Sequence, residues 1–421
     1  MRPIPLGRPF NALWFGTGAA NLGDGMALFV LPLLALAVDA SPGGVAAVTA
    51  ALTLAWPVFG LHAGWIVDRV DRRTVLIGVN VIRALVLAGL TAAHLTGTLS
   101  LPLILAGAVL LGAAETLVDT ALTATIPMVA EPAVRNRANA RIEATINLTN
   151  QLAGPPLAGL LAAATLALAT GASAALYVLA VAGVLAMTLR RPLAAARTAS
   201  GGVAAAHAAS DGVVAGFRHL WRQPVVRTLT LFTAAMNIPW AVATALLVVY
   251  AVSPGPLGLS TAQYGLVLTA MAVGGLLAST VVERLRRRFG VTRLLIADAA
   301  GTVLLVAPVA ADGPVWTVVA GAVVAGAGSS VWRILVATIR QNLSPPHLLG
   351  RVYAASRVLS WGVIPAGAAL AGLAAELWGV RTVFVIATVL AVAILAAFIP
   401  YALRTDLSAA VEPGRTPQPV L

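Results

Sequence analysis

The sequence predicts an all-α membrane protein in which twelve transmembrane helices form two pseudo-symmetric six-helix bundles. Of the 421 residues, 59% are hydrophobic and only 10% are charged, whereas ordinary soluble domains carry about 25% charged residues. The apolar residues fall into runs long enough to cross about 30 Å of hydrocarbon. Motifs of the first half also return in the second half. A soluble fold could not bury so much apolar surface, so we expect a multi-pass membrane protein.

Six apolar runs precede a polar stretch and six follow it. The first six are expected near residues 10–38, 45–67, 74–96, 101–130, 139–168 and 172–190. The second six are expected near residues 226–251, 262–282, 292–311, 314–341, 348–376 and 381–403. The predicted domains are therefore an N-terminal bundle (1–190), a cytoplasmic linker (191–225), a C-terminal bundle (226–404) and a disordered cytoplasmic tail (405–421).

The arginines predict the orientation, because cytoplasmic loops carry an excess of basic residues. With the N-terminus in the cytoplasm, every arginine lies on the cytoplasmic side except Arg83 and Arg333, which fall within spans, and Arg381. Both termini are then cytoplasmic. The net charge is +12, and the arginines lie in short turns between helices. Charges placed in this way suit contact with anionic lipid headgroups. They do not form a patch of the kind that binds nucleic acid.

Composition also argues against an enzyme. The chain has no cysteine, and its five histidines are scattered without metal-ligand spacing. It has no Gly-rich phosphate loop ending in Gly-Lys-Ser or Gly-Lys-Thr, so we expect no ATP hydrolysis. We therefore expect no catalytic residues, no metal and no cofactor.

The two halves repeat at an offset of about 215 residues. Gly64-x-x-x-Asp68-Arg69 is matched by Ser279-x-x-x-Glu283-Arg284, and Pro9 by Pro224. Parallel six-helix repeats are the transporter architecture in which a central site faces each side of the membrane in turn.

The charged stretch at residues 64–73 lies between two apolar runs, so its charges gather at one membrane surface. Gly64 allows another helix to approach, while Asp68, Arg69 and Arg73 can cap or pair with helix ends. With Glu283 and Arg284 they are predicted to form a cytoplasmic gate. The alternative is a solvated loop that only sets topology. Replacing Asp68 with Asn should cut transport and leave membrane insertion intact if the gate exists.

Gly64-x-x-x-Asp68-Arg69-x-x-Arg72-Arg73 resembles the loop between helices 2 and 3 of the major facilitator superfamily. Asp71 in place of the usual glycine is similar to the drug- and siderophore-exporter branch, which includes macrolide and enterobactin exporters. The resemblance covers about residues 8 to 404. It implies alternating access by two six-helix halves and a chamber lined by spans 1, 4, 7 and 10.

Ionisable residues within spans are functional candidates, because each costs several kcal/mol to insert unless it faces water or a partner. Asp24 lies midway along the first span between Gly23 and Gly25. It can take a proton from one side and release it at the other. Alternatively, a neighbouring arginine or helix end satisfies it and its role is structural. Asp298, in the ninth span, has no evident partner, and we expect a structural role for it.

Glu115 and Asp119 share one face of the fourth span. Together with Asp24 they are the candidates for proton coupling. Arg83 and Arg333 are the cations available to them. Because Asp119 and Arg333 hold equivalent positions in the two halves, a pair across the halves is one prediction; a buried pair that only specifies packing is the other.

The predicted chamber residues are polar or aromatic and lie within the lining spans: Asn21, Asn237, Trp240 and Trp332. Their flat apolar faces and amide groups suit amphipathic organic molecules. Trp14 is a further candidate, but an interfacial position is its more common role.

Gly154-Pro155-Pro156-Leu157-Ala158-Gly159 resembles the Gly-Pro-rich signature of exporters in the superfamily, and Pro365 lies in its counterpart in span 11. Proline removes a backbone hydrogen bond and bends a helix. Gly154, Pro155, Gly159 and Pro365 are therefore predicted to bend and pack helices.

The expected function is secondary active export of a drug, secondary metabolite or siderophore across a bacterial plasma (inner) membrane, driven by the proton gradient. Its partners would be a small amphipathic substrate, protons and the lipid bilayer, and we expect a monomer. Two alternatives stay open: a lipid or lysolipid transporter or importer, and a non-transporting membrane sensor on the same scaffold.

Overall fold

The structure is a computed structural model that describes residues 6–39, 41–131, 134–187, 214–345 and 348–411. These residues are almost entirely helical, and they contain no strand, only isolated bridge residues such as Val252 with Leu259. Eleven of their helices are long and apolar enough to cross a membrane. The predicted all-α membrane fold is confirmed.

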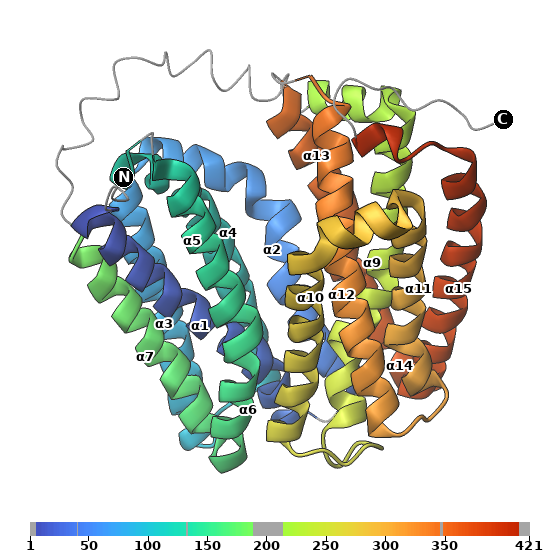
Figure 1. Ribbon diagram of the computed structural model, residues 1–421. Coiled ribbons are helices and arrows are strands. Elements are labelled where there is room, and N and C mark those ends of the chain that lie inside the picture. The colour runs from blue at the N-terminus through green and yellow to red at the C-terminus, as the bar shows by residue number, and fades with distance from the viewer. Residues whose placement is uncertain (1–5, 40, 132–133, 188–213, 346–347, 412–421) are drawn as a thin grey trace. The chain divides into compact units, whose positions relative to one another are not determined.

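The chain divides into two compact units (Figure 1). Unit 1 comprises Met1–Arg197 and Ala251–Thr269, and unit 2 comprises Thr198–Tyr250 and Ala270–Leu421. The segment Ala251–Thr269 includes the first turns of a helix that continues into unit 2. In unit 1 its Thr261 hydroxyl donates to the Gly159 carbonyl at 3.2 Å.

The helices of unit 1 are α1 (Gly7–Val38), α2 (Pro42–Arg69), α3 (Arg72–Leu95), α4 (Leu101–Val129), α5 (Arg135–Ile146), η2 (Asn147–Ala153), α6 (Gly154–Ala164) and α7 (Leu166–Leu185). In unit 1, buried residues of α1, α2, α3, α4, α5 and α7 form one apolar core. Helix α1 packs against α7, α2 against α4, and α3 against both α4 and α7. The inner residues of α1, α3 and α7 therefore meet.

Unit 2 has a comparable set of helices. They are α9 (Pro224–Ala251), the remainder of α10 (Thr261–Phe289), α11 (Val291–Ala310), α12 (Val315–Asn342), α13 (Leu349–Trp361), α14 (Val363–Trp378), α15 (Val380–Arg404) and η5 (Ala409–Val411). Helix α11 packs against α12 and α15. Leu295, Ala299, Trp332 and Phe398 meet in the core between them.

The fifth predicted span is not one continuous α-helix. It consists of α5, the π-helical segment η2 and α6, and α6 ends at Ala164 rather than near residue 168. The sixth span begins at Leu166 rather than near residue 172. Thr165 sets this boundary: its backbone is extended, and its hydroxyl caps α7 by accepting from the Leu168 N–H at 3.0 Å.

Both polar segments expected outside the bundles contain ordered structure. At the end of the predicted linker, residues 214–222 are helical, and Leu220 packs with Val226, Val352 and Ala355. The tail was expected to be disordered from residue 405, but Leu407 and Ala410 are fully buried in the core of unit 2. Their apolar side chains account for the difference. Residues 188–213 and 412–421 lie outside the described part of the chain.

Candidate functional site

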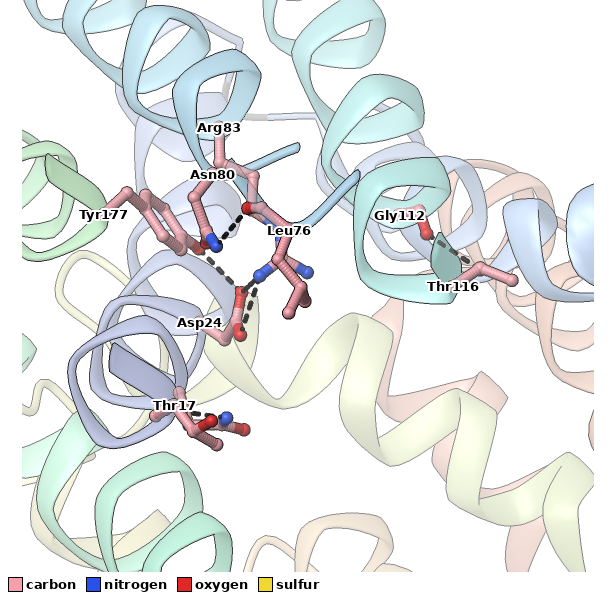
Figure 2. Close-up of polar contacts among 9 residues, drawn as sticks. Thr17, Asp24, Leu76, Asn80, Arg83, Gly112, Thr116 and Tyr177 are labelled. Carbon is pink, nitrogen blue, oxygen red and sulfur yellow. Dashed lines mark hydrogen bonds and ion pairs between the residues drawn. The ribbon is translucent and has the colours of Figure 1, made fainter. Parts of the chain in front are cut away.

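A buried ion pair lies at the centre of unit 1 (Figure 2). Arg83 of α3 contacts the carboxylate of Asp24 of α1 through one nitrogen, Nη1, at 3.0 Å from Oδ1 and 3.1 Å from Oδ2. The Tyr177 hydroxyl of α7 donates to Asp24 Oδ1 at 2.7 Å. Arg83 is 0% exposed, Tyr177 1% and Asp24 9%. Three helices are thus joined through one carboxylate.

Among the described residues, the side chains around this ion pair include polar atoms without a hydrogen-bond partner. Arg83 Nε and Nη2 and Asn80 Oδ1 are buried and have no hydrogen-bond partner, while Asn80 Nδ2 donates to the Leu76 carbonyl at 2.8 Å. Asn80 and Arg83 are three residues apart and therefore lie on the same side of α3. Asn21, one turn before Asp24, donates to the Thr17 carbonyl at 3.0 Å. The interior of unit 1 is therefore polar along α1 and α3.

This arrangement differs from the pairing that the sequence suggested for Arg83. We expected Arg83 to be one of two cations available to Glu115 and Asp119, and its direct ion pair in the structure is with Asp24. The geometry favours the alternative in which Asp24 is satisfied by a neighbouring arginine. Tyr177 was not singled out at all. In the sequence, Tyr177 is a single phenol within the sixth apolar run, which by itself does not indicate a partner. The packing of α1 against α7 places it beside Asp24.

Helix α4 places two acids at different depths in unit 1. Glu115 is half-buried and Asp119 is exposed, although both lie far from the helix ends. Arg333 holds a similar position within α12 of unit 2 and is also exposed. Since Asp119 belongs to unit 1 and Arg333 to unit 2, their pairing stays a prediction.

Several predicted gate residues have contacts within their own unit. Arg73 donates to the Val184 carbonyl at 3.3 Å and to the Leu185 carbonyl at 2.7 Å, which caps the end of α7. Glu283 pairs with Arg286 at 2.7 Å and with Arg287 at 2.9 Å on its own helix.

The other predicted gate residues lie on α2 and α10. Arg69, at the end of α2, and Arg284, on α10, are exposed. Gly64 and Asp68 lie on α2, but the surroundings of Gly64 and the side chain of Asp68 are outside the described part of the structure. A gate between the two halves stays a prediction.

The predicted chamber residues divide between partly accessible and core positions. Asn237 is partly buried and donates to the Ser360 carbonyl at 2.6 Å, and Trp240 is half-buried. Trp332 is 5% exposed, and its indole donates to the Thr233 hydroxyl at 2.9 Å within the core of unit 2. The burial of Trp332 favours packing over lining a chamber.

Trp14 lies against α5 in unit 1. Its indole donates to the Thr145 hydroxyl at 2.6 Å, and the Arg141 guanidinium lies 3.7 Å from the centre of its ring. One face of Trp14 is therefore covered by a cation from the same unit.

The Gly-Pro segment lies where the fifth span departs from α-helical geometry. The π-helix η2 ends at Ala153, and Gly154 and Pro155 begin α6. A Cβ on Gly154 would meet the backbone of Gly25 at 2.8 Å, so α1 and α6 touch there without side chains between them. A Cβ on Gly159 would meet the Thr261 carbonyl at 2.6 Å. Pro365 lies just after the break between α13 and α14 at Gly362.

Comparison with known protein families identifies the chain. A family model described as "Transmembrane secretion effector" matches residues 4–421. The chain belongs to this family. It is a family of major facilitator transporters, and the predicted resemblance is confirmed.

Two curated relatives of this transmembrane secretion effector family member match along most of its length. One is "Multidrug efflux pump Tap" of Mycolicibacterium fortuitum, 26% identical over 416 residues, which covers 95% of this chain and 98% of the relative. The other is "Uncharacterized MFS-type transporter y4rN" of Sinorhizobium fredii (strain NBRC 101917 / NGR234), 28% identical over 372 residues, covering 84% of this chain and 85% of the relative.

Solved transporters share the fold. The nucleoside transporter NupG matches with a TM-score of 0.72 at 15% identity, covering 94% of this chain and 99% of that one. A bacterial homologue of the iron transporter ferroportin, solved in an inward-facing state, matches with a TM-score of 0.70 at 17% identity, covering 94% and 99%. At such identities the likeness concerns the fold alone. This family member is therefore a multi-pass membrane transporter of the major facilitator type.

Proposed function

We propose that this protein exports small amphipathic compounds from a bacterial cell by alternating access, with protons moving in the opposite direction. The observation that carries the proposal is the full-length similarity to a protein named as a multidrug efflux pump, which leaves neither bundle unmatched. Alternating access needs both six-helix bundles, and the similarity to the efflux pump extends over both of them.

The exposed charges inside α4 and α12 support a water-lined path. A charged side chain far from the ends of a transmembrane helix is costly when it faces lipid, so such residues usually face a water-filled cavity or a partner. Asp119 on α4 and Arg333 on α12 are exposed on the surfaces of their units. We assign both to the surface that water and substrate reach during transport.

Glu115 and Asp119 are the proposed coupling acids at this surface. They lie four residues apart on α4, so they share one face and repel each other when both are ionised. Protonation of one acid relieves this repulsion. Asp24, the third predicted coupling residue, pairs with Arg83, and we propose that it instead holds α1 and α3 together, because its protonation would leave the guanidinium uncompensated.

The accessible polar and aromatic groups of unit 2 support an amphipathic substrate. Trp240 offers a flat apolar face and Asn237 an amide, and both are only partly buried on α9. Such a pair binds an organic ring with a nearby hydrogen-bonding group. The arginine distribution supports a plasma-membrane location with both termini in the cytoplasm.

The decisive experiment measures accumulation of fluorescent amphipathic compounds in an efflux-deficient bacterium that expresses the protein. We expect lower accumulation than in cells without it, and a protonophore should abolish the difference. The Asp119→Asn variant should behave like the empty cell. Asp312→Asn is the matched control, because Asp312 lies in the exposed turn after α11 and pairs with Arg381 at the start of α15.

Two results would overturn the proposal. Accumulation that is unchanged by the protein across a broad panel would argue against export of amphipathic compounds. Higher accumulation in the presence of the protein would indicate import. Everted membrane vesicles separate the two directions, because an exporter in the predicted orientation fills them when a proton gradient is applied.

A further inference from the structure

Asp298 is a buried acid in unit 2 that the proposed coupling acids do not include. It lies on α11, within the membrane-spanning part of the helix, and is 3% exposed. Among the residues that the structure describes, no hydrogen bond or ion pair reaches its carboxyl group. Because α11 rises about 1.5 Å per residue, Asp298 lies roughly two turns from the start of the helix at Val291.

The carboxyl group lies at a close contact between α11 and α12. A Cβ added to Gly328 of α12 would collide with Oδ1 of Asp298. Farther along the same two helices, a Cβ on Gly321 would collide with the Leu304 carbonyl. Glycines therefore let the two helices approach until the carboxyl group is enclosed. Leu295 and Ala299, on either side of Asp298, belong to the apolar core.

Within the described ranges of the chain, no nearby charge offsets an ionised Asp298. The charged or titratable residues on α11, α12 and α15 are Arg293, Arg333, Arg340, Arg381, Tyr401 and Arg404, and none of these residues pairs with Asp298. Arg340 donates to the Ser356 hydroxyl at 2.7 Å, and Arg381 pairs with Asp312 at 2.8 Å. Arg293, Arg333 and Arg404 are exposed, and Tyr401 is half-buried.

An ionised carboxylate in such surroundings is very costly, and a buried acid without a partner usually becomes neutral instead. A purely structural acid is commonly stabilised by a cation, as Asp24 is by Arg83 in unit 1. Asp298 lies 215 residues after Arg83, so the two residues hold equivalent positions in the repeat. Where unit 1 has the cation of a fixed pair, unit 2 has a lone acid.

We propose that Asp298 is a proton-binding residue of the transport cycle. It holds a proton while α11 and α12 are packed as in this structure, and it releases the proton when a shift of α12 at Gly328 admits water to the carboxyl group. The step exchanges one proton with water and breaks no other bond. The inference rests on the proposed proton-coupled transport and adds a coupling residue in the second unit.

Infrared spectroscopy of the purified full-length protein tests proton binding without any substrate. The protonated carboxyl group has a C=O stretch distinct from that of a carboxylate. We expect a protonated-acid band at neutral pH that is absent in Asp298→Asn and unchanged in Asp312→Asn. An identical band in wild type and Asp298→Asn would overturn the proposal.

A transport assay tests coupling. Asp298→Asn should lose proton-driven accumulation of substrate in everted vesicles, yet still let substrate equilibrate down its own gradient. Asp298→Glu keeps a titratable group and should restore accumulation with a shifted pH profile, which a merely structural role would not produce. Asp298→Glu also provides the test of coupling if Asp298→Asn folds poorly.

The outcomes separate this inference from the proposed function. Proton-driven export by wild type and equally by Asp298→Asn would overturn the role of Asp298 and leave the proposed export intact. No proton-driven transport by wild type would overturn the coupling role together with the proposed function. The infrared band would then decide only whether the site binds a proton.

Discussion

In unit 1 the buried carboxylate of Asp24 lies against the guanidinium of Arg83 and the hydroxyl of Tyr177, whereas in unit 2 the buried carboxyl group of Asp298 has neither. Asp298 holds the position in the repeat that Arg83 holds in unit 1, and both acids are almost fully enclosed. The difference lies in the partners.

The partners decide what a buried acid can do. Breaking a buried ion pair leaves an uncompensated charge, so the protonation of Asp24 is opposed by Arg83. A lone acid has no such cation to leave behind, and its charge depends only on whether water reaches it. We infer that the first site holds helices together and the second can change its charge during transport.

The same substitution in the two units should have very different effects on stability. Asp24→Asn leaves the guanidinium of Arg83 buried without a counter-charge, which should lower the free energy of unfolding by about 3–5 kcal/mol. Asp298→Asn replaces a neutral acid with a group of similar volume and should cost less than about 1.5 kcal/mol. Unfolding in detergent, followed by helix content, measures both.

If Asp24→Asn and Asp298→Asn lowered the free energy of unfolding equally, the proposed difference between the two acids would be wrong. The double variant Asp24→Asn with Arg83→Met is the control, because it removes both charges together. We expect it to recover part of the loss of Asp24→Asn, since replacement of both members of a buried pair is often well tolerated.

Tyr177→Phe tests the third member of the cluster in unit 1. It removes the hydroxyl that donates to Asp24 at 2.7 Å. A hydrogen bond to a charged group contributes about 1.5–3 kcal/mol, and we expect a loss in that range. Tyr353→Phe is the control, because Tyr353 is 50% exposed. Equal melting temperatures for Tyr177→Phe and wild type would show that Arg83 alone stabilises the carboxylate.

Gly328→Ala tests the enclosure of Asp298. The added methyl group would collide with the carboxyl group, and overpacking of this kind typically costs about 1–3 kcal/mol. Combining it with Asp298→Ala should remove most of the loss, because the carboxyl group is then absent. Gly350→Ala is the matched control, since a Cβ there meets nothing within 4 Å. Unaltered stability of Gly328→Ala would argue against close packing around Asp298.

Glu283→Gln is expected to have the smallest effect on stability. Glu283 pairs with Arg286 and Arg287 on an exposed part of its own helix, and surface ion pairs contribute little to folding. We expect an unchanged melting temperature. A drop in transport at unchanged stability would support the predicted gate, and full transport would remove Glu283 from it.

Some local features of the structure follow from the sequence, and others do not. Proline predicts a departure from regular helix, and the π-helix before Pro155 lies at such a position. The cap at Thr165 was missed because one polar residue in a long apolar stretch gives a weak signal, although its backbone N–H donates to the Leu161 carbonyl at the end of α6 and its hydroxyl caps the start of α7. The sequence predicts that Arg83 is a cation available to the intramembrane acids, but not that Asp24 is the acid in direct contact with it.

Sequence alone determined the fold class, because the length and number of apolar runs admit few alternatives in a bilayer, where every backbone group must be satisfied within helices. It also identified the family through the charged loop and the repeat. Only the tertiary structure decided which buried charged side chains pair with each other. Pairing depends on the rotation of each helix and on its neighbours: contacts of α1 with α7, and of α3 with α7, bring Asp24, Arg83 and Tyr177 together across 153 positions of the chain. The same dependence places Asp298 against Gly328, without a charged partner among the described residues.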